Sequence, residues 1–173
     1  TFLGAKRVAV GHDIRLSGPS ISEALIKGLR EAGCDAVDIG QCGTEMIYFA
    51  TAHLNLDGGI MVTASHNPKN YNGMKLVREG ARPISRDTGL RDIEKLVMAG
   101  DFSPFAQTPG KVEHIDITDE YVEHLLSYID VKALKPLTVV ANTGNGAGGP
   151  IVAALKKRLP VEIIPVFAEP DGN

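Results

Sequence analysis

The sequence predicts an α/β protein: a mixed, mainly parallel sheet with helices on both faces, followed by the start of a second, similar α/β domain. Short apolar runs typical of buried strands alternate with longer segments in which apolar residues recur at helical spacing. Turns rich in glycine and proline separate these segments. A less regular stretch with two prolines, residues 101–117, interrupts the alternation and indicates a domain boundary. We therefore expect a first domain over residues 1–110 and an incomplete second domain over residues 111–173.

The first strand and helix are predicted near the amino terminus. Residues 6–10 form a short β-branched run, and the turn residues of 11–19 end it. Ser20 and Glu23 have the spacing of a capping box, which predicts that a helix begins there. Apolar residues then recur at helical spacing until Gly33, which ends the helix.

Three further strands and two helices complete the predicted first domain. The strands are expected at residues 36–39, 58–63 and 74–77. Thr44 begins the second helix, and Asp87 is predicted to cap a third helix that ends at Gly100. The link between the last two strands is short and rich in turn residues, so we expect the fourth strand to run antiparallel at the sheet edge.

The same alternation starts again after the irregular stretch. A helix is marked by Tyr121, Leu125 and Ile129. A strand, a glycine-rich turn, a helix and a strand follow at residues 137–141, 142–149, 151–158 and 161–167. The chain begins without methionine and ends before a full sheet is built, so we expect a fragment of a longer protein whose exposed sheet edge needs a partner.

Composition and charge exclude several classes of protein. Contents of 43% hydrophobic and 23% charged residues are ordinary for a globular chain. The net charge is −3 without a block of like charges, so we expect neither nucleic acid nor a membrane as a partner. No apolar run is long enough to span a membrane and no signal peptide is recognisable, so we expect a cytoplasmic protein. Cys34 and Cys42 lack metal-binding or redox spacing and are expected to be reduced.

The reactive side chains are concentrated in the loop that follows the predicted strand 58–63. Ser65, His66 and Asn67 lie in this loop, and Lys75 follows shortly after it. A phosphorylated Ser65 would carry about −1.5 to −2 charges, which the other three side chains could hold as donors. A serine beside a histidine is also typical of an ordinary polar loop, so these residues alone leave both interpretations open.

A second loop is predicted at the same edge of the sheet. In parallel sheets the loops at the carboxyl ends of the strands bind the ligands. Residues 11–19 and 63–73 both follow strands, so Arg15 and Ser65 can share one edge. The planar guanidinium of Arg15 is suited to binding phosphate.

The runs TASHNP and YNGMKLV, which contain Ser65 and Lys75, resemble the active-serine loop of the α-D-phosphohexomutases. The runs KLVREGARPISRDTGL and GTEMIYFAT are similar to bacterial members that act on mannose and glucose phosphates. The resemblance covers essentially the whole chain, which corresponds to the first domain of that family and the start of the second. It implies an isomerase that interconverts mannose 6-phosphate and mannose 1-phosphate, a phosphomannomutase, and that also accepts glucose phosphates.

The resemblance also implies roles for individual residues. Ser65 would carry the phosphoryl group, which passes through a bisphosphorylated sugar, with a hexose 1,6-bisphosphate as activator. Lys75, His66 and Arg15 would be catalytic and, with Asn67, would bind phosphate and substrate. Mg²⁺ would bind Ser65 through its phosphate, together with aspartates that this chain lacks. The implied partners are the hexose phosphate and the remaining domains of the protein, without which we expect no turnover.

Two other functions stay open at this point. One is a phosphoglucosamine mutase, although Met74 and the run ARPIS resemble the mannose and glucose branch. The other is a non-catalytic module that binds a phosphosugar or a partner chain. The glycine-rich run 142–149 lacks the Gly-Lys-Ser/Thr ending of a phosphate-binding loop, so we interpret it as a tight backbone turn. No Gly-x-Ser-x-Gly elbow of a serine hydrolase occurs.

Overall fold

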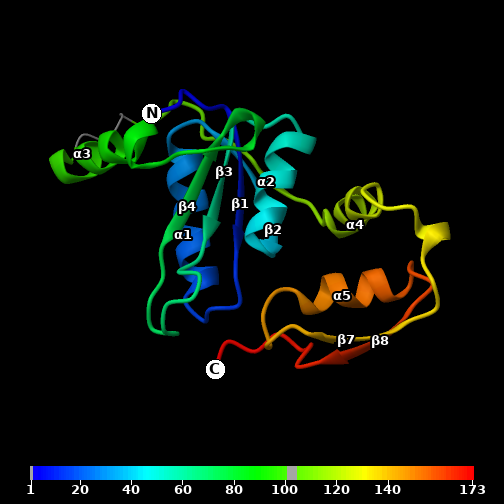
Figure 1. Cartoon of the computed structure of the whole chain (residues 1–173). Helices are drawn as coiled ribbons and strands as arrows, with labels where there is room; N and C mark the ends of the chain where they lie inside the picture. Colours follow the sequence, from blue (N-terminus) through cyan, green and yellow to red (C-terminus); the bar gives the residue numbers. More distant parts are fainter. Residues whose placement is uncertain (1, 101–104) are drawn as a thin grey trace.

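The computed structural model describes residues 2–100 and 105–173, which form two sheets (Figure 1). The first sheet has the strand order β5-β4-β3-β1-β2-β6, and the second pairs β7 with β8. The strands are β1 (Arg7–His12), β2 (Asp35–Gln41), β3 (Gly58–Val62), β4 (Met74–Arg78), β5 (Arg82–Pro83), β6 (Val112–His114), β7 (Thr138–Asn142) and β8 (Glu162–Val166). The α-helices are α1 (Gly18–Glu31), α2 (Thr44–His53), α3 (Arg91–Ala99), α4 (Thr118–Leu126) and α5 (Gly149–Lys156).

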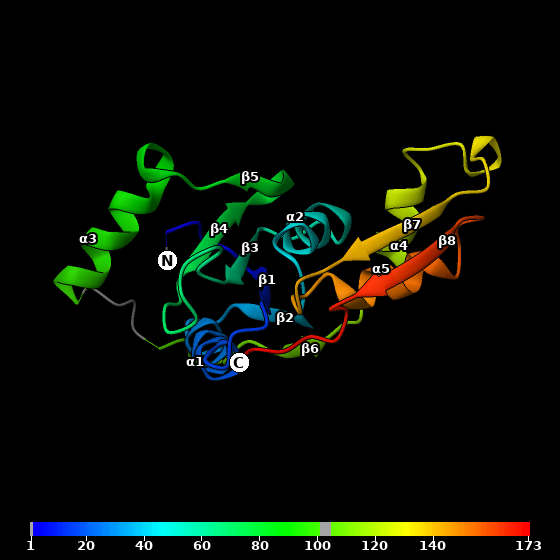
Figure 2. The ribbon, with the colours of Figure 1, turned by 60° about the horizontal axis from the view of Figure 1, so that its bottom comes forward.

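The first sheet is mixed and mainly parallel, as the sequence predicted. Strand β1 pairs in parallel with β2 and β3, and β2 pairs in parallel with β6. Strand β4 is antiparallel to β3, with Lys75 opposite Met61. Helices α1 and α2 lie on opposite faces of the strands (Figure 2). Both faces are thus covered, which explains why β1 is an almost continuous apolar run instead of an alternating one.

The main hydrophobic core lies between α2 and the sheet. Ile47 of α2 packs with Met61 and Val77 of the strands, and all three are at most 2% exposed. The core continues into α4, because Tyr121 belongs to the same cluster and its ring lies 5.4 Å from that of Phe49. Helix α4 therefore joins the second sheet to the first unit through apolar packing.

Three helix starts differ from those predicted, and that of α5 is Gly149 instead of residue 151. Helix α1 begins at Gly18 instead of Ser20, because Ser20 donates its hydroxyl back to the Ser17 carbonyl (3.1 Å) and caps nothing. Helix α3 is preceded by one π-helical turn, Arg86–Leu90, whose capping box is formed by Ser85 and Thr88 instead of Asp87. Gly100 ends α3 with a φ of 63°, as predicted, because a residue without Cβ adopts this left-handed conformation at little cost.

The sheet edges also differ in part from those predicted. Strand β4 runs antiparallel as expected, but β5 pairs with its outer side and forms that edge. At the other edge β6, beyond the expected boundary at residue 110, extends the first sheet. A polar three-residue strand has too little pattern to be recognised from sequence. We propose that the change of unit falls between β6 and β7; the irregular stretch used to place it lies partly outside the described residues, at 101–104.

The second sheet is thinly covered. Helix α5 packs on β8, whereas several apolar side chains of the two strands and their flanks are exposed: Leu137, Val139, Val140, Ile164 and Phe167. Among residues 2–100 and 105–173, no helix is both long enough and apolar enough to cross a membrane.

Both cysteines are free thiols buried in the first unit, as expected. Cys42 is 1% exposed, and its Sγ lies 3.8 Å from Sδ of Met61. Burial, which disfavours the thiolate, raises the pKa of Cys42 to about 12 and also raises that of Cys34.

We predict that Gly59→Ala destabilises the protein by about 1–3 kcal/mol. A Cβ at position 59 would overlap Thr51 Oγ1 and approach Ile47 Cγ2 at 2.8 Å, inside the packed core. Urea unfolding measures the change. Gly28→Ala is the matched control, because its Cβ meets no atom within 4 Å and alanine favours a helix interior. Equal changes in stability for the two substitutions would show that close packing around Gly59 is not the cause.

We predict that the thiol of Cys42 does not react with Ellman's reagent in the folded protein up to about pH 10, because the reactive thiolate forms only near its raised pKa. Addition of denaturant at pH 8 releases both thiols. Rapid labelling of Cys42 in the folded state, followed by peptide mass spectrometry, would contradict this assignment.

Candidate active site at the Ser65 loop

The loop 63–73 starts at the carboxyl end of β3, next to the loop that follows β1. These strands are parallel neighbours, with His12 opposite Val62 at their ends. The N–H of Asp13 donates to the Val62 carbonyl (3.1 Å), and Arg15 Nη2 donates to the Ser65 carbonyl (2.8 Å). The expectation that Arg15 and Ser65 share one sheet edge is confirmed.

The guanidinium of Arg15 lies at the centre of the hydrogen bonds that hold the loop 63–73. Arg15 is 8% exposed, and its guanidinium donates to four backbone carbonyls and one carboxylate. Its Nη1 bonds the carbonyls of Pro68 (2.7 Å) and Tyr71 (2.9 Å), its Nη2 those of Ser65 (2.8 Å) and Asn67 (2.7 Å), and its Nε the Asp13 carboxylate (3.2 Å). These bonds use all five N–H groups of a guanidinium. The role of phosphate ligand expected for Arg15 therefore does not fit its hydrogen bonding, because no donor is left over.

Asp13 and Thr63 extend this network to the backbone of Ser65. Asp13 Oδ1 accepts from the N–H of Arg15 (3.0 Å), and its Oδ2 accepts from the Thr63 hydroxyl (2.6 Å). The Thr63 hydroxyl in turn accepts from the N–H of Ser65 (2.9 Å). The carboxylate orients the threonine hydroxyl, so its lone pair faces the serine amide.

The Ser65 side chain is exposed, and its backbone is in the left-handed region with a φ of 55°. A non-glycine residue pays roughly 1–3 kcal/mol for such a conformation and keeps it only where its surroundings impose it. The Ser65 hydroxyl lies 3.0 Å from Nδ1 of His66, which can accept or donate a proton there. The Ser65 hydroxyl and the His66 imidazole are thus adjacent and exposed to solvent.

Asn67 and Lys75 differ in how they relate to this hydroxyl. Asn67 Nδ2 donates to the Ala64 carbonyl (2.7 Å), so in this structure it shapes the loop. Lys75 lies on β4, on the α2 side of the sheet with Val77, and is exposed. Within the described residues its amine has no hydrogen-bond or ion-pair partner. Lys75 is thus available for an anion, whereas Asn67 is already engaged.

Sequence reasoning did not single out Asp13 and Thr63. The available signal was an acidic residue two positions before Arg15, a spacing that allows a carboxylate to bond the arginine within one loop. Thr63, in contrast, is 6% exposed and acts through a partner 50 positions away, which no local pattern reveals.

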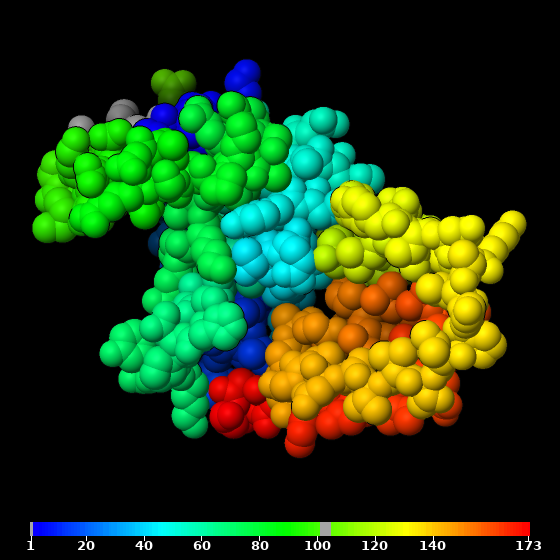
Figure 3. Space-filling model, in the orientation of Figure 1, coloured from blue at the N-terminus to red at the C-terminus, as the bar shows by residue number. Residues whose placement is uncertain are grey.

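The carboxyl-terminal residues lie close to this edge of the first unit (Figure 3). The backbone of Gly172 approaches the Ile14 carbonyl so closely that a Cβ would overlap it. Asp171 donates its N–H to the Asn145 carbonyl (2.9 Å), and Asn145 Nδ2 donates to the Glu169 carbonyl (2.8 Å). Since Asn145 has a φ of 57°, the glycine-rich run acts as a tight turn that holds this segment.

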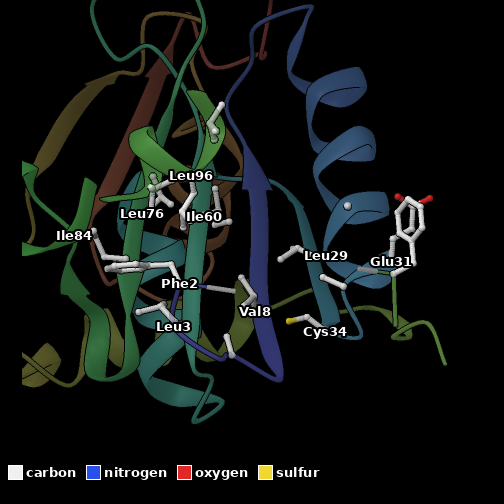
Figure 4. A pocket seen from close by; sticks show the side chains of 16 residues that line it. Phe2, Leu3, Val8, Leu29, Glu31, Cys34, Ile60, Leu76, Ile84 and Leu96 are labelled. Carbon is white, nitrogen blue, oxygen red and sulfur yellow. The ribbon is translucent and has the colours of Figure 1, made fainter. Parts of the chain in front are cut away.

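An apolar cavity of about 750 Å³ lies elsewhere, on the α1 side of the sheet (Figure 4). Phe2, Leu29, Ile60, Leu76 and Leu96 point into it, and no residue of the loop 63–73 lines it. It offers few polar groups to a sugar phosphate. The exposed Ser65 hydroxyl beside His66 therefore identifies the candidate site better than cavity size does.

In the part of the chain that the structure describes, no group of three or more His, Cys, Asp or Glu side chains could hold a metal ion. These residues alone therefore do not fit a Mg²⁺ site, which requires several oxygen ligands.

The chain is similar to phosphohexomutases over nearly its whole length. Residues 2–104 match the family described as phosphoglucomutase/phosphomannomutase, alpha/beta/alpha domain I. The phosphomannomutase of Escherichia coli K12 is 56% identical over 178 residues, which cover 99% of this chain and 39% of that protein. The phosphohexose mutases of Xanthomonas campestris (strain B100) are 55% identical over 166 residues, 96% of this chain and 37% of the relative. A solved structure of a phosphoglucomutase/phosphomannomutase family protein from Burkholderia thailandensis has a TM-score of 0.83 at 37% identity, over 98% of this chain and 37% of that one.

The fold and the loop define the class: a domain with a helix-covered, mainly parallel sheet that presents an exposed serine at the carboxyl ends of its strands. The chain belongs to the phosphoglucomutase/phosphomannomutase family. It spans 37% to 39% of the length of the relatives named above.

We predict that Thr63→Val destabilises the protein by about 2 kcal/mol, because a buried bond to a carboxylate and the acceptor for the Ser65 amide are lost together. Thr51→Val is the matched control: Thr51 is also buried but only donates its hydroxyl to the Ile47 carbonyl (2.7 Å) within α2. Its loss costs less than about 1 kcal/mol. Equal effects in urea unfolding would show that the network around Asp13 adds nothing.

Proposed function

We propose that the protein to which this chain belongs is a phosphomannomutase, which interconverts mannose 6-phosphate and mannose 1-phosphate and also accepts glucose phosphates. The observation that carries the proposal is the exposed Ser65 hydroxyl, 3.0 Å from Nδ1 of His66, on a loop whose carbonyls are held by Arg15. The relatives' names support it, since proteins 56% and 55% identical are called phosphomannomutase and phosphohexose mutases. A cytoplasmic location belongs to the same proposal.

In the proposed reaction, phospho-Ser65 gives its phosphoryl group to the free hydroxyl of the hexose phosphate. The bond between phosphorus and Ser65 Oγ breaks and a bond to the sugar oxygen forms. The proton of the sugar hydroxyl leaves to a base, and Ser65 Oγ takes up a proton. The bisphosphorylated sugar then turns over in the site, and its other phosphate returns to Ser65. Such transfers need positioning and charge stabilisation more than covalent help.

His66 and Lys75 fit different parts of this sequence. His66 Nδ1 is within hydrogen-bond distance of Ser65 Oγ, so it can take the serine proton when the phosphate returns. Lys75 is exposed and cationic, so it is suited to hold the phosphate at Ser65 and to assist proton transfer with the sugar. Asn67 would bind substrate only if its bond to the Ala64 carbonyl were exchanged.

Mg²⁺ is part of the proposal as the ion that offsets the charge of the transferring phosphate. At this edge a phosphorylated Ser65 would offer oxygens suited to it, whereas the Asp13 carboxylate is already bonded to Arg15 and Thr63. The other ligands would come from chain outside these 173 residues, as would the groups that choose between sugars.

The remaining part of the protein is the proposed partner of this chain. The relatives are longer, and the exposed apolar side chains of β7 and β8 need cover. We propose that the 173-residue chain alone has no meaningful mutase turnover.

The test is to purify the full-length protein, incubate it with a hexose 1,6-bisphosphate and locate phosphate by peptide mass spectrometry. We expect one phosphate on Ser65, and a fall in turnover of at least about 10³-fold for Ser65→Ala, because the carrier oxygen is gone. Ser127→Ala, an exposed serine at the end of α4, is the control and should keep full activity. An active mutase that never carries phosphate on Ser65 would refute the carrier role.

A further inference from the structure

We propose that Arg15 is a positioning residue that, with Asp13 and Thr63, holds the Ser65 loop in the one conformation from which Ser65 can exchange a phosphoryl group. It does so from beneath the loop, without touching phosphate. The proposal rests on the proposed role of Ser65 and adds a structural requirement to it.

The carbonyls of the Ser65 loop converge on Arg15. Residues 63–73 form neither helix nor sheet over most of their length, so few regular bonds hold them. Four of their carbonyl oxygens nevertheless lie 2.7 to 2.9 Å from the two terminal nitrogens of Arg15. Because a guanidinium is planar and rigid, these bonds fix the four carbonyls relative to one another.

Charge leads to the same conclusion. A guanidinium is a cation, and the charge of a residue that is only 8% exposed needs partners. Asp13 supplies the opposite charge at 3.2 Å, and the carbonyl dipoles supply the rest. A phosphate ligand would have to displace one of these partners. The observed bonds leave Arg15 electrostatically satisfied without a ligand.

The peptide between Ser65 and His66 is trans, so its C=O and N–H point in opposite directions. Since the Ser65 carbonyl faces Arg15, the N–H of His66 points away from Arg15, and within the described residues it donates to no protein group. Arg15 thereby leaves a free backbone donor beside Ser65, where a phosphate would be held.

The experiment compares Arg15→Lys with Arg7→Lys in the full-length protein. A lysine ammonium has three donors and cannot serve four carbonyls and Asp13 together, whereas Arg7 makes one exposed ion pair with Glu113. For Arg15→Lys we expect kcat to fall about 100-fold while KM for the hexose phosphate changes less than about 3-fold, because the carrier is misplaced but no substrate contact is lost. Arg7→Lys should leave both constants unchanged.

Hydrogen exchange supplies a readout that does not depend on turnover. We expect the amides of residues 64–73 to exchange at least about tenfold faster in Arg15→Lys, with the strands of the first sheet unchanged. A large rise in KM with unchanged exchange would assign Arg15 to phosphate binding and overturn the proposal. So would unchanged kcat, KM and exchange.

A second variant covers the case in which Arg15→Lys does not fold. Thr63→Val keeps the arginine and removes only the bridge from Asp13 to the Ser65 amide, so the same split between kcat and KM should appear at about tenfold. An equal loss through KM would contradict positioning. Ser65→Ala distinguishes the carrier role of Ser65 from the positioning role of Arg15. If that variant stays active, the carrier role fails. The hydrogen-exchange result then still decides whether Arg15 orders the loop.

Discussion

The Ser65 loop depends on one buried cation, the guanidinium of Arg15, and on the carbonyl oxygens gathered around it. Removing a charge from water is costly unless it is paired and fully hydrogen-bonded, and here both conditions are met within two loops. The left-handed backbone of Ser65 is tolerated because the bonds on both sides of it, from Thr63 to its N–H and from Arg15 to its carbonyl, leave little choice. The backbone conformation of Ser65 is therefore fixed by the two loops together, and the sequence around Ser65 alone does not fix it.

The sheet brings the loops after β1 and β3 close enough to form these hydrogen bonds. Parallel pairing of β1 with β3 brings the ends of the two strands to the same level, so that residues about fifty positions apart bond one another. Packing of α2 against the strands, through Ile47 and Met61, fixes the strands themselves. The order of causes thus leads from apolar pattern to sheet, from sheet to neighbouring loops, and from these to an exposed hydroxyl beside His66.

Much of this could be inferred from the sequence. Alternating apolar runs gave the mixed sheet and its helices, and the serine loop was placed on the correct edge with Arg15 beside it. What the sequence could not show was which atoms the guanidinium would choose, because carbonyl acceptors are present at every residue and carry no signature. The start of α3 and the strand β6 were missed for a related reason: short polar segments take their structure from neighbours.

The packing of α4 has a mechanical consequence. Tyr121 belongs to the core cluster, with its ring 5.4 Å from that of Phe49, and Ile151 of α5 packs against the same cluster. Aromatic packing therefore connects the two units, and a movement of one unit past the other would expose these rings to water. The position of the glycine-rich turn relative to the Ser65 loop therefore depends on core side chains that belong to neither segment.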